Sequence, residues 1–205
     1  MAISKGARRT DGLESAEQVQ MVVEEIAKKS PTVADLFLLG VETQLRGVDM
    51  REWKWSDLDI GSKVLRITQD KTKEAVEVEL TETARDVLQA RYNERGDNVY
   101  VFQNDSNRSR GKPISRSKIH AEIQYAVDKL KARKLIPQEA VISMHSSRKT
   151  IASIAHSKGE DLEVISKMLG HRSTEHTRAY LGITQAKVDA LRTKYSTGIK
   201  RGKRS

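Results

Sequence analysis

The sequence of 205 residues contains no cysteine, which excludes disulfide bonds, thiolate zinc sites and a cysteine nucleophile. It also has no apolar run approaching the ~20 residues that a membrane-spanning helix needs. Basic residues occur near the start of the chain, but no apolar stretch follows them as it would in a secretion signal. We therefore expect a cytoplasmic protein of bacterial type with no membrane span.

The net charge of +9 is distributed unevenly along the chain. Three segments without any acidic residue, 1–10, 106–120 and 197–205, together carry +12, so the rest of the chain carries −3. A single basic tail would indicate only solubility. Three basic patches, one of them internal, favour a polyanionic partner, and we predict that this partner is nucleic acid.

The apolar pattern predicts one domain of α+β class, mainly α-helical, with a small antiparallel three-stranded sheet at one edge. The first helix begins near Ser15, which has capping-box spacing to Gln18, and a second, buried helix begins at Pro31. Further helices are expected over about 81–95, 119–130, 145–157, 162–169, 173–181 and 184–195. The strands are expected at 63–68, 75–80 and 99–102, with a polar turn over 69–74 between the first two.

Five features of the sequence could carry chemistry: Arg46, Lys71, the pair His145-x-x-Arg148, the turn Leu169-Gly170-His171, and Tyr180. Each of them alone also has an ordinary structural explanation. An arginine after a helix neutralises its last carbonyls, a lysine in a hairpin turn is solvated, and a histidine and an arginine three residues apart can form a surface pair. Likewise, a histidine after a glycine C-cap can be a loop residue, and a tyrosine in a helix is usually half-buried.

The order and spacing of these features resemble the catalytic signature of the tyrosine recombinases, the family of phage integrases. The segment SMHSSRKTIASIAHSKGEDLEVISKMLGHRSTEHTRAYLG resembles the second half of this signature. It contains the counterparts of the family's H-x-x-R box, its L-G-H box and the nucleophile nine residues after that histidine. The family's first arginine box and hairpin lysine are similar to VETQLRGVDMREWKWSDLDI and the turn that follows. The resemblance covers about residues 14–182. It implies a tyrosine recombinase catalytic domain there, flanked by a basic arm over 1–13 and a C-terminal helix and basic tail over 183–205.

The resemblance implies a site-specific recombinase that cleaves and rejoins DNA through a 3′-phosphotyrosyl intermediate. Arg46 and Arg148 would each offer paired donors to the oxygens of the scissile phosphate, with His145 and His171 as further donors. Tyr180 would be the nucleophile. A phenol with a pKa of about 10 is only ~0.1% ionised at pH 7, so a base or a positive field must stand close to it. His145 is the candidate for that base.

The resemblance assigns the protonation of the leaving 5′ oxygen to a lysine in the hairpin. We select Lys71, which directly follows Gln-Asp, although the turn is short enough for Lys73 to serve instead. Since a phosphotyrosyl bond conserves the energy of the broken bond, we expect no ATP, no metal and no other cofactor. The absence of a P-loop and of metal-ligand spacing among the five histidines agrees with this expectation.

The sequence departs from the family's usual pattern in three places. Gln44 stands where a glycine commonly precedes Leu-Arg, and Gly47-Val48-Asp49 replaces the common Ile-Ser-Glu. Asp49 nevertheless keeps a carboxylate three residues after Arg46, where it could support the guanidinium. Lys149 follows Arg148 where a histidine is frequent. These departures concern groups around the site rather than the reacting groups themselves.

We expect double-stranded DNA as the partner. The candidate DNA-binding residues belong to the hairpin and the internal basic segment: Lys73, Arg108, Arg110, Lys112, Arg116 and Lys118. By resemblance, the helix that this segment opens approaches the major groove, and the protein forms a homotetramer on paired sites. In the absence of DNA the protein could instead be a monomer. The helix over 184–195 could dock on a neighbouring copy or fold back on its own chain.

The biological role expected from the resemblance is integration or excision of a phage or other mobile element, in association with a bacterial nucleoid. Two other functions remain open, a DNA-binding regulator without activity on the same fold and a type IB topoisomerase, which shares the chemistry. The N-terminal helical domain usual in the family has no counterpart in these 205 residues. A short stand-alone recombinase and a fragment of a longer protein are both compatible with that observation.

Overall fold

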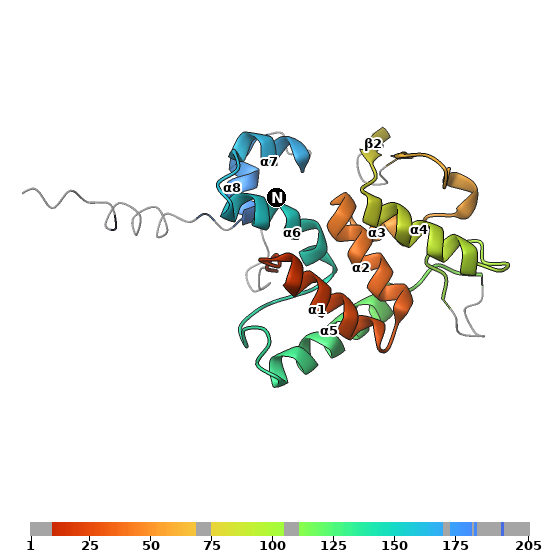
Figure 1. The fold of residues 1–205 in the computed structure, drawn as a ribbon, viewed down its shortest axis with the longest axis horizontal. Coiled ribbons are helices and arrows are strands. Elements are labelled where there is room, and N and C mark those ends of the chain that lie inside the picture. Colours follow the sequence, from red (N-terminus) through yellow and green to blue (C-terminus); the bar gives the residue numbers. More distant parts are fainter. Residues whose placement is uncertain are drawn as a thin grey trace, which may run out of the picture. The chain divides into compact units, whose positions relative to one another are not determined.

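The computed structural model describes residues 10–68, 75–104, 111–169, 173–181, 183 and 194; for 67, 68, 75, 76, 179 and 180 it describes the backbone alone. The chain divides into two compact units, Met1–Lys158 and Gly159–Ser205 (Figure 1). The first unit contains the hydrophobic core and the small sheet. Within the described residues, no helix has the length and apolar character that crossing a membrane would require.

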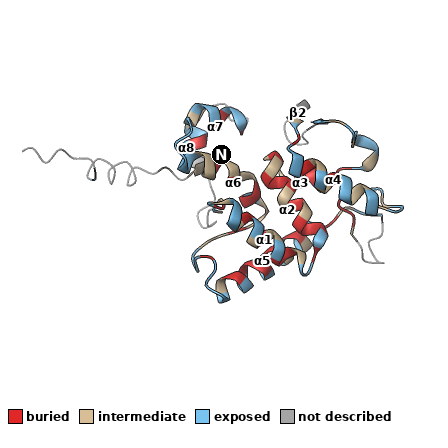
Figure 2. Cartoon of the chain, viewed as in Figure 1, coloured by how far each residue is buried: buried red, intermediate tan, exposed pale blue. Residues whose placement is uncertain are grey.

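Helix α2 (Pro31–Thr43) is the centre of the first unit. Ser30 caps its start by accepting a hydrogen bond from the amide of Val33, and proline at the first helical position has a backbone already suited to a helix. The helix packs against α1 (Ala16–Ala27), α4 (Glu82–Glu94) and α6 (Met144–Ser157), as Figure 1 shows. Most of its residues are buried in consequence (Figure 2), which confirms the predicted burial.

Helix α5 (Arg116–Ala132) packs against α1 and completes the core. It buries the apolar stripe that the sequence predicted: Ile119, Ile123, Ala126, Val127 and Leu130. The predicted helices over 15–29, 81–95 and 145–157 are confirmed as α1, α4 and α6. Burial of these stripes supplies most of the stabilisation because each large apolar side chain removed from water contributes about 1.5–3 kcal/mol.

The sheet contains two antiparallel strands in the described residues, β1 (Val64–Thr68) and β2 (Ala75–Glu79), with Val64 opposite Glu79. The prediction of a third strand at 99–102 is wrong. In that segment Tyr100 makes only an isolated bridge with Lys54, and the amide of Val101 donates to the carbonyl of Trp53 at 2.9 Å. Val101 and Phe102 are adjacent and both buried in the core, so this segment is a short apolar run, which the sequence alone does not distinguish from a strand.

Two short elements of the first unit were not predicted, α3 (Gly47–Met50) and the 3₁₀ turn η1 (Trp55–Asp57). The second unit contains α7 (Leu162–Met168), capped by the side chain of Asp161, and α8 (Thr174–Leu181), and these two helices pack together. They confirm the predicted helices over 162–169 and 173–181. The helix predicted over 184–195 lies outside the described residues, apart from Lys194.

Candidate active site

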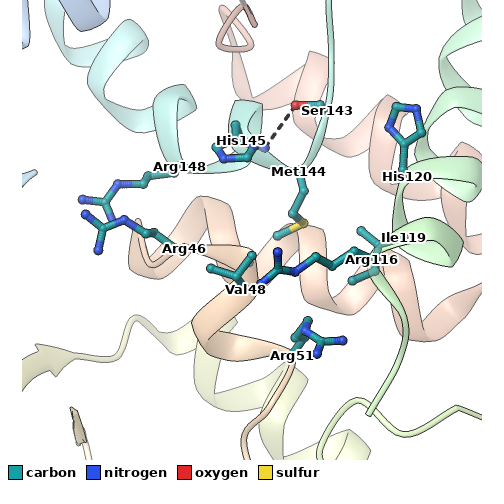
Figure 3. A pocket seen from close by; sticks show the side chains of 11 residues that line it. Arg46, Val48, Arg51, Arg116, Ile119, His120, Ser143, Met144, His145 and Arg148 are labelled. Atoms are coloured by element: carbon teal, nitrogen blue, oxygen red, sulfur yellow. Dashed lines mark hydrogen bonds between the residues drawn. The ribbon is translucent and has the colours of Figure 1, made fainter. Parts of the chain in front are cut away.

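A cavity of about 190 Å³ opens in the first unit where α3, α5 and the start of α6 meet (Figure 3). Four arginines line it: Arg46, Arg51, Arg116 and Arg148. His120 and His145 also line it, and Val48, Ile119 and Met144 supply apolar surface. No acidic residue is among the described residues that line the cavity, so its rim is strongly cationic.

The turn after α2 sets the position of Arg46. Gln44 closes the helix in the left-handed conformation, with φ of 51°, and its side-chain amide donates to the carbonyls of Val41 at 2.8 Å and Glu42 at 3.0 Å. The chain then reverses, and Arg46 becomes the N-cap of α3. Asp49, which is buried, lies with a carboxylate oxygen 4.0 Å from Nη1 of Arg46. The carboxylate expected to support Arg46 is therefore in place.

The unusual Gln44 leads to a stability prediction. A left-handed residue normally favours glycine, but Gln44→Gly removes two hydrogen bonds to helix-end carbonyls and enlarges the unfolded ensemble, and we expect these losses to outweigh the relief of backbone strain. The free energy of unfolding should fall by about 1 kcal/mol in urea denaturation. Lys134→Gly is the matched control, since Lys134 has φ of 59°; it should be neutral or stabilising. A more stable Gln44→Gly variant would contradict this account.

The first turn of α6 carries His145 and Arg148. A capping box fixes this turn. The hydroxyl of Ser143 accepts from the amide of His145 at 3.2 Å (Figure 3), and the amide of Ser143 donates to the hydroxyl of Ser146 at 3.0 Å. His145 is exposed and Arg148 half-buried, and both line the cavity. The N-terminus of this 14-residue helix adds its positive dipole end to the charge of the arginines.

Close packing of glycines against α6 brings Arg46 to the same cavity. A Cβ atom on Gly40 of α2 would lie 3.0 Å from Cβ of Ser147 and 2.9 Å from Cε of Met144, closer than packed carbon atoms normally approach. A Cβ atom on Gly47, directly after Arg46, would lie 3.0 Å from Cε of Met144. In Figure 3 the side chains of Arg46 and Arg148 extend toward the same end of the cavity.

The charges that shift the pKa of His145 are positive. The protein atoms around its ring displace water, and Lys149, Arg148 and Arg46 repel a further positive charge, so that the pKa of His145 is lowered from its ordinary value. A lowered pKa favours the neutral form of the imidazole over the charged form. A neutral imidazole can accept a proton, whereas the arginines beside it remain charged.

The predicted site residues fall into three groups. One cavity is lined by Arg46, His145 and Arg148, although Arg46 is more than 90 positions from the other two in the sequence. Arg116, from the predicted DNA-binding set, lines the same cavity. Lys112 is exposed and Lys118 half-buried, and neither lines this cavity. Tyr180 belongs to α8 of the second unit, and its side chain is not described. Outside the described residues lie Lys71, Lys73, Arg108, Arg110 and His171.

Two cavity residues were missed from the sequence, Arg51 and His120. Arg51 donates from Nη1 to the carbonyl of Ile114 at 2.6 Å and so joins the end of α3 to the segment before α5. Nothing in its sequence context indicates that contact. His120 lies four residues after Arg116 in α5 and therefore shares its face, which a predicted helix beginning at Arg116 instead of at about 119 would have indicated. Among the described residues, no cluster of three or more His, Cys, Asp or Glu could hold a metal ion.

The chain matches the phage integrase family over residues 15–187 and belongs to that family. A probable integrase/recombinase protein of Methanocaldococcus jannaschii is 26% identical to it over 172 residues. That alignment includes 80% of this chain but only 51% of the relative. The chain thus spans about half the length of the curated relative that it matches.

Solved tyrosine recombinases share the fold. The XerA recombinase superposes with a TM-score of 0.64 at 20% identity, covering 94% of this chain and 68% of that one. An integrase of the transposon Tn1549, solved with circular intermediate DNA, superposes with a TM-score of 0.68 at 14% identity, covering 94% of this chain and 68% of that one. A lambda integrase dimer bound to a core site superposes with a TM-score of 0.61 at 18% identity, covering 98% of this chain and 66% of that one. The first unit and the two helices after it therefore have the architecture of a tyrosine recombinase catalytic domain.

Proposed function

We propose that this chain is the catalytic part of a site-specific DNA recombinase of tyrosine type. The observation that carries the proposal is the convergence of Arg46, His145 and Arg148 on one cavity, which no acidic residue lines in the described part of the chain. Two guanidiniums that share a cavity can each present paired donors to the oxygens of one phosphate. The membership of the chain in the phage integrase family and its ordered motifs support the same function.

In the proposed reaction the phenolic oxygen of Tyr180 attacks the phosphorus of the scissile phosphate. The P–O5′ bond breaks as the P–O bond to tyrosine forms, which leaves a 3′-phosphotyrosyl link and a 5′ hydroxyl. His145, in its neutral form, accepts the phenolic proton, and Lys71 donates a proton to the leaving 5′ oxygen; Lys73 is the alternative donor. Arg46 and Arg148 stabilise the charge on the equatorial oxygens, with His171 as a further donor.

The proposed DNA contacts begin with Arg116, which lines the cavity. Arg116 extends from the first turn of α5 toward Val48 and Met144 (Figure 3), so that it can contact phosphates next to the scissile one. The remaining proposed contacts are those of the basic segment and the hairpin: Lys73, Arg108, Arg110, Lys112 and Lys118. In this proposal residues 1–13 form a basic arm, 14–182 the catalytic domain and 183–205 a C-terminal helix and tail.

We further propose the assembly and the role implied by the resemblance. Four copies act on paired DNA sites to integrate or excise a phage or another mobile element, in the bacterial cytoplasm at the nucleoid. The solved relatives named above include a lambda integrase dimer bound to a core site and an integrase with circular intermediate DNA, which is the kind of substrate such a reaction uses.

The decisive experiment is covalent capture on a nicked suicide duplex. The wild-type chain should give a protein–DNA adduct that survives denaturation, and Tyr180→Phe should give none because phenylalanine has no nucleophilic oxygen. Tyr125→Phe is the matched control, since Tyr125 is an exposed tyrosine of α5, and it should form the adduct as the wild type does.

Other outcomes would change the assignment. An adduct that persists in Tyr180→Phe would show that another residue is the nucleophile. Specific binding without any adduct would indicate a DNA-binding regulator. Relaxation of supercoiled plasmid without exchange between sites would indicate a type IB topoisomerase.

A further inference from the structure

Residues Thr10–Leu13, here called the N-terminal strap, lie against the helix that carries His145 and Arg148. The amide of Asp11 donates to the carbonyl of Val141 at 2.8 Å, and the amide of Val141 donates back to Oδ2 of Asp11 at 2.9 Å. The amide of Leu13 donates to Oγ1 of Thr150 in α6 at 3.1 Å. Leu13 is 2% exposed and Thr150 is fully buried, so Leu13 anchors the strap in the core.

Gly12 allows the strap to approach α6 this closely. A Cβ atom at Gly12 would lie 3.0 Å from Cβ of Ser153 and 3.1 Å from the carbonyl oxygen of Lys149. A larger side chain would therefore push the strap away from the helix.

Lys149 connects the strap to the candidate active site. Its ammonium donates to the carbonyl of Thr10 at 2.7 Å, and the residue is only 8% exposed. Burying an ammonium is costly unless its hydrogen bonds are made, so this contact constrains both the strap and the helix. Lys149 directly follows Arg148 and lies one helical turn after His145, yet it does not line the cavity.

We propose that Lys149 is a positioning residue: held by the Thr10 carbonyl, it fixes the turn of α6 that presents His145 and Arg148, which makes the N-terminal strap a working part of the active site. The inference rests on the proposed function only in its expected effect on the rate of adduct formation. Phosphoryl transfer depends on the placement of the groups that contact the phosphate, and a misplacement of about 1 Å can cost about 10²-fold in rate.

The charge of Lys149 provides a readout that a purely structural role would not change. The groups that act on His145 are Lys149 and Arg148 of its own helix and Arg46 from the turn after α2. Across the cavity it also faces Arg51, Arg116 and His120. Removing the ammonium removes one positive charge, so the pKa of His145 should rise. Because the proposed base is the neutral imidazole, the acidic limb of the pH–rate profile should move to higher pH.

Four variants test the proposal. Lys149→Met removes the charge and the hydrogen bond, whereas Lys149→Arg retains both. Gly12→Val displaces the strap while it leaves Lys149 intact. Lys158→Met is the matched control, because Lys158 is the exposed C-cap residue of the same helix. For each variant, thermal melting checks folding, adduct formation on the suicide duplex gives the rate over a range of pH, and the NMR titration of the His145 ring in the free protein gives its pKa.

The expected pattern is specific. Lys149→Met and Gly12→Val should slow adduct formation by about 10- to 100-fold at unchanged duplex affinity, while Lys149→Arg and Lys158→Met should resemble the wild type. In Lys149→Met the pKa of His145 should also rise. If Lys149→Met folds and forms the adduct at the wild-type rate, the proposal is overturned. If Lys149→Met fails to fold, a wild-type rate of adduct formation in Gly12→Val overturns it instead. If the wild type itself forms no adduct, the proposed function fails, and an unchanged His145 titration in Lys149→Met would then overturn the positioning role separately.

Discussion

Replacing Arg148 by lysine should lower the rate of adduct formation about 10²–10³-fold, the loss seen when one preorganised donor to a developing oxyanion is removed. Lysine keeps the positive charge, so duplex affinity should change little. What it loses is the planar pair of donors that matches two phosphate oxygens at once. Arg46→Lys should behave in the same way because both side chains extend toward one end of the cavity (Figure 3).

Single-turnover kinetics on the suicide duplex, with affinity measured in parallel, check this expectation. Arg66→Lys is the matched control, since Arg66 is an exposed arginine of β1 that pairs with Glu77 at 2.8 Å. It should cleave as the wild type does. Equal rates for Arg148→Lys and Arg66→Lys would mean that Arg148 provides charge alone and that the proposed bidentate contact is wrong.

A second large effect is expected at the contact between α2 and α6. Gly40→Val should lower the free energy of unfolding by about 2–3 kcal/mol, because its side chain would overlap Ser147 and Met144 in a seam that has no spare volume. For a chain of this size, such a loss corresponds to a fall in the melting temperature of about 4–12 °C. Adduct formation should fall as well, since the displaced turn of α6 carries His145 and Arg148.

Calorimetry or circular dichroism melting measures this effect. Gly61→Val is the matched control, because a Cβ atom there would approach no more than Oδ1 of Asp59, at 3.6 Å. The control should melt within a few degrees of the wild type. If both variants melted alike, the separation of α2 and α6 would be more adaptable than the close contact of Gly40 implies.

The elements predicted most securely from the sequence are those with long, regular apolar periods. The stripe on α5 and the all-round apolar character of α2 appear in the structure as expected. The third strand failed because the short apolar run around Val101 is buried in the core and makes only an isolated bridge instead of pairing in the sheet. Helix α3 has four residues, too few for a period to be recognised in the sequence.

For the candidate site, the motif order grouped Arg46, His145 and Arg148, which line one cavity, but the packing that brings these three together is not visible in any local pattern. Gly40 and Gly47 allow α6 to approach Arg46, and neither stands in a motif of its own. Lys149 was visible only as a departure from the usual residue after Arg148. Its partner, the carbonyl of Thr10, lies 139 positions away in the sequence, a distance that only tertiary structure closes.

Among the residues that the structure describes, four arginines and no carboxylate line the cavity, which has a practical consequence for handling the protein. Guanidinium groups stay protonated at every pH that the fold tolerates, so acid or alkali will not release a polyanion held there. Ionic strength is the effective variable, because each phosphate contact that forms liberates a condensed counterion. Host nucleic acid should therefore accompany the protein through low-salt chromatography and separate from it in concentrated sodium chloride.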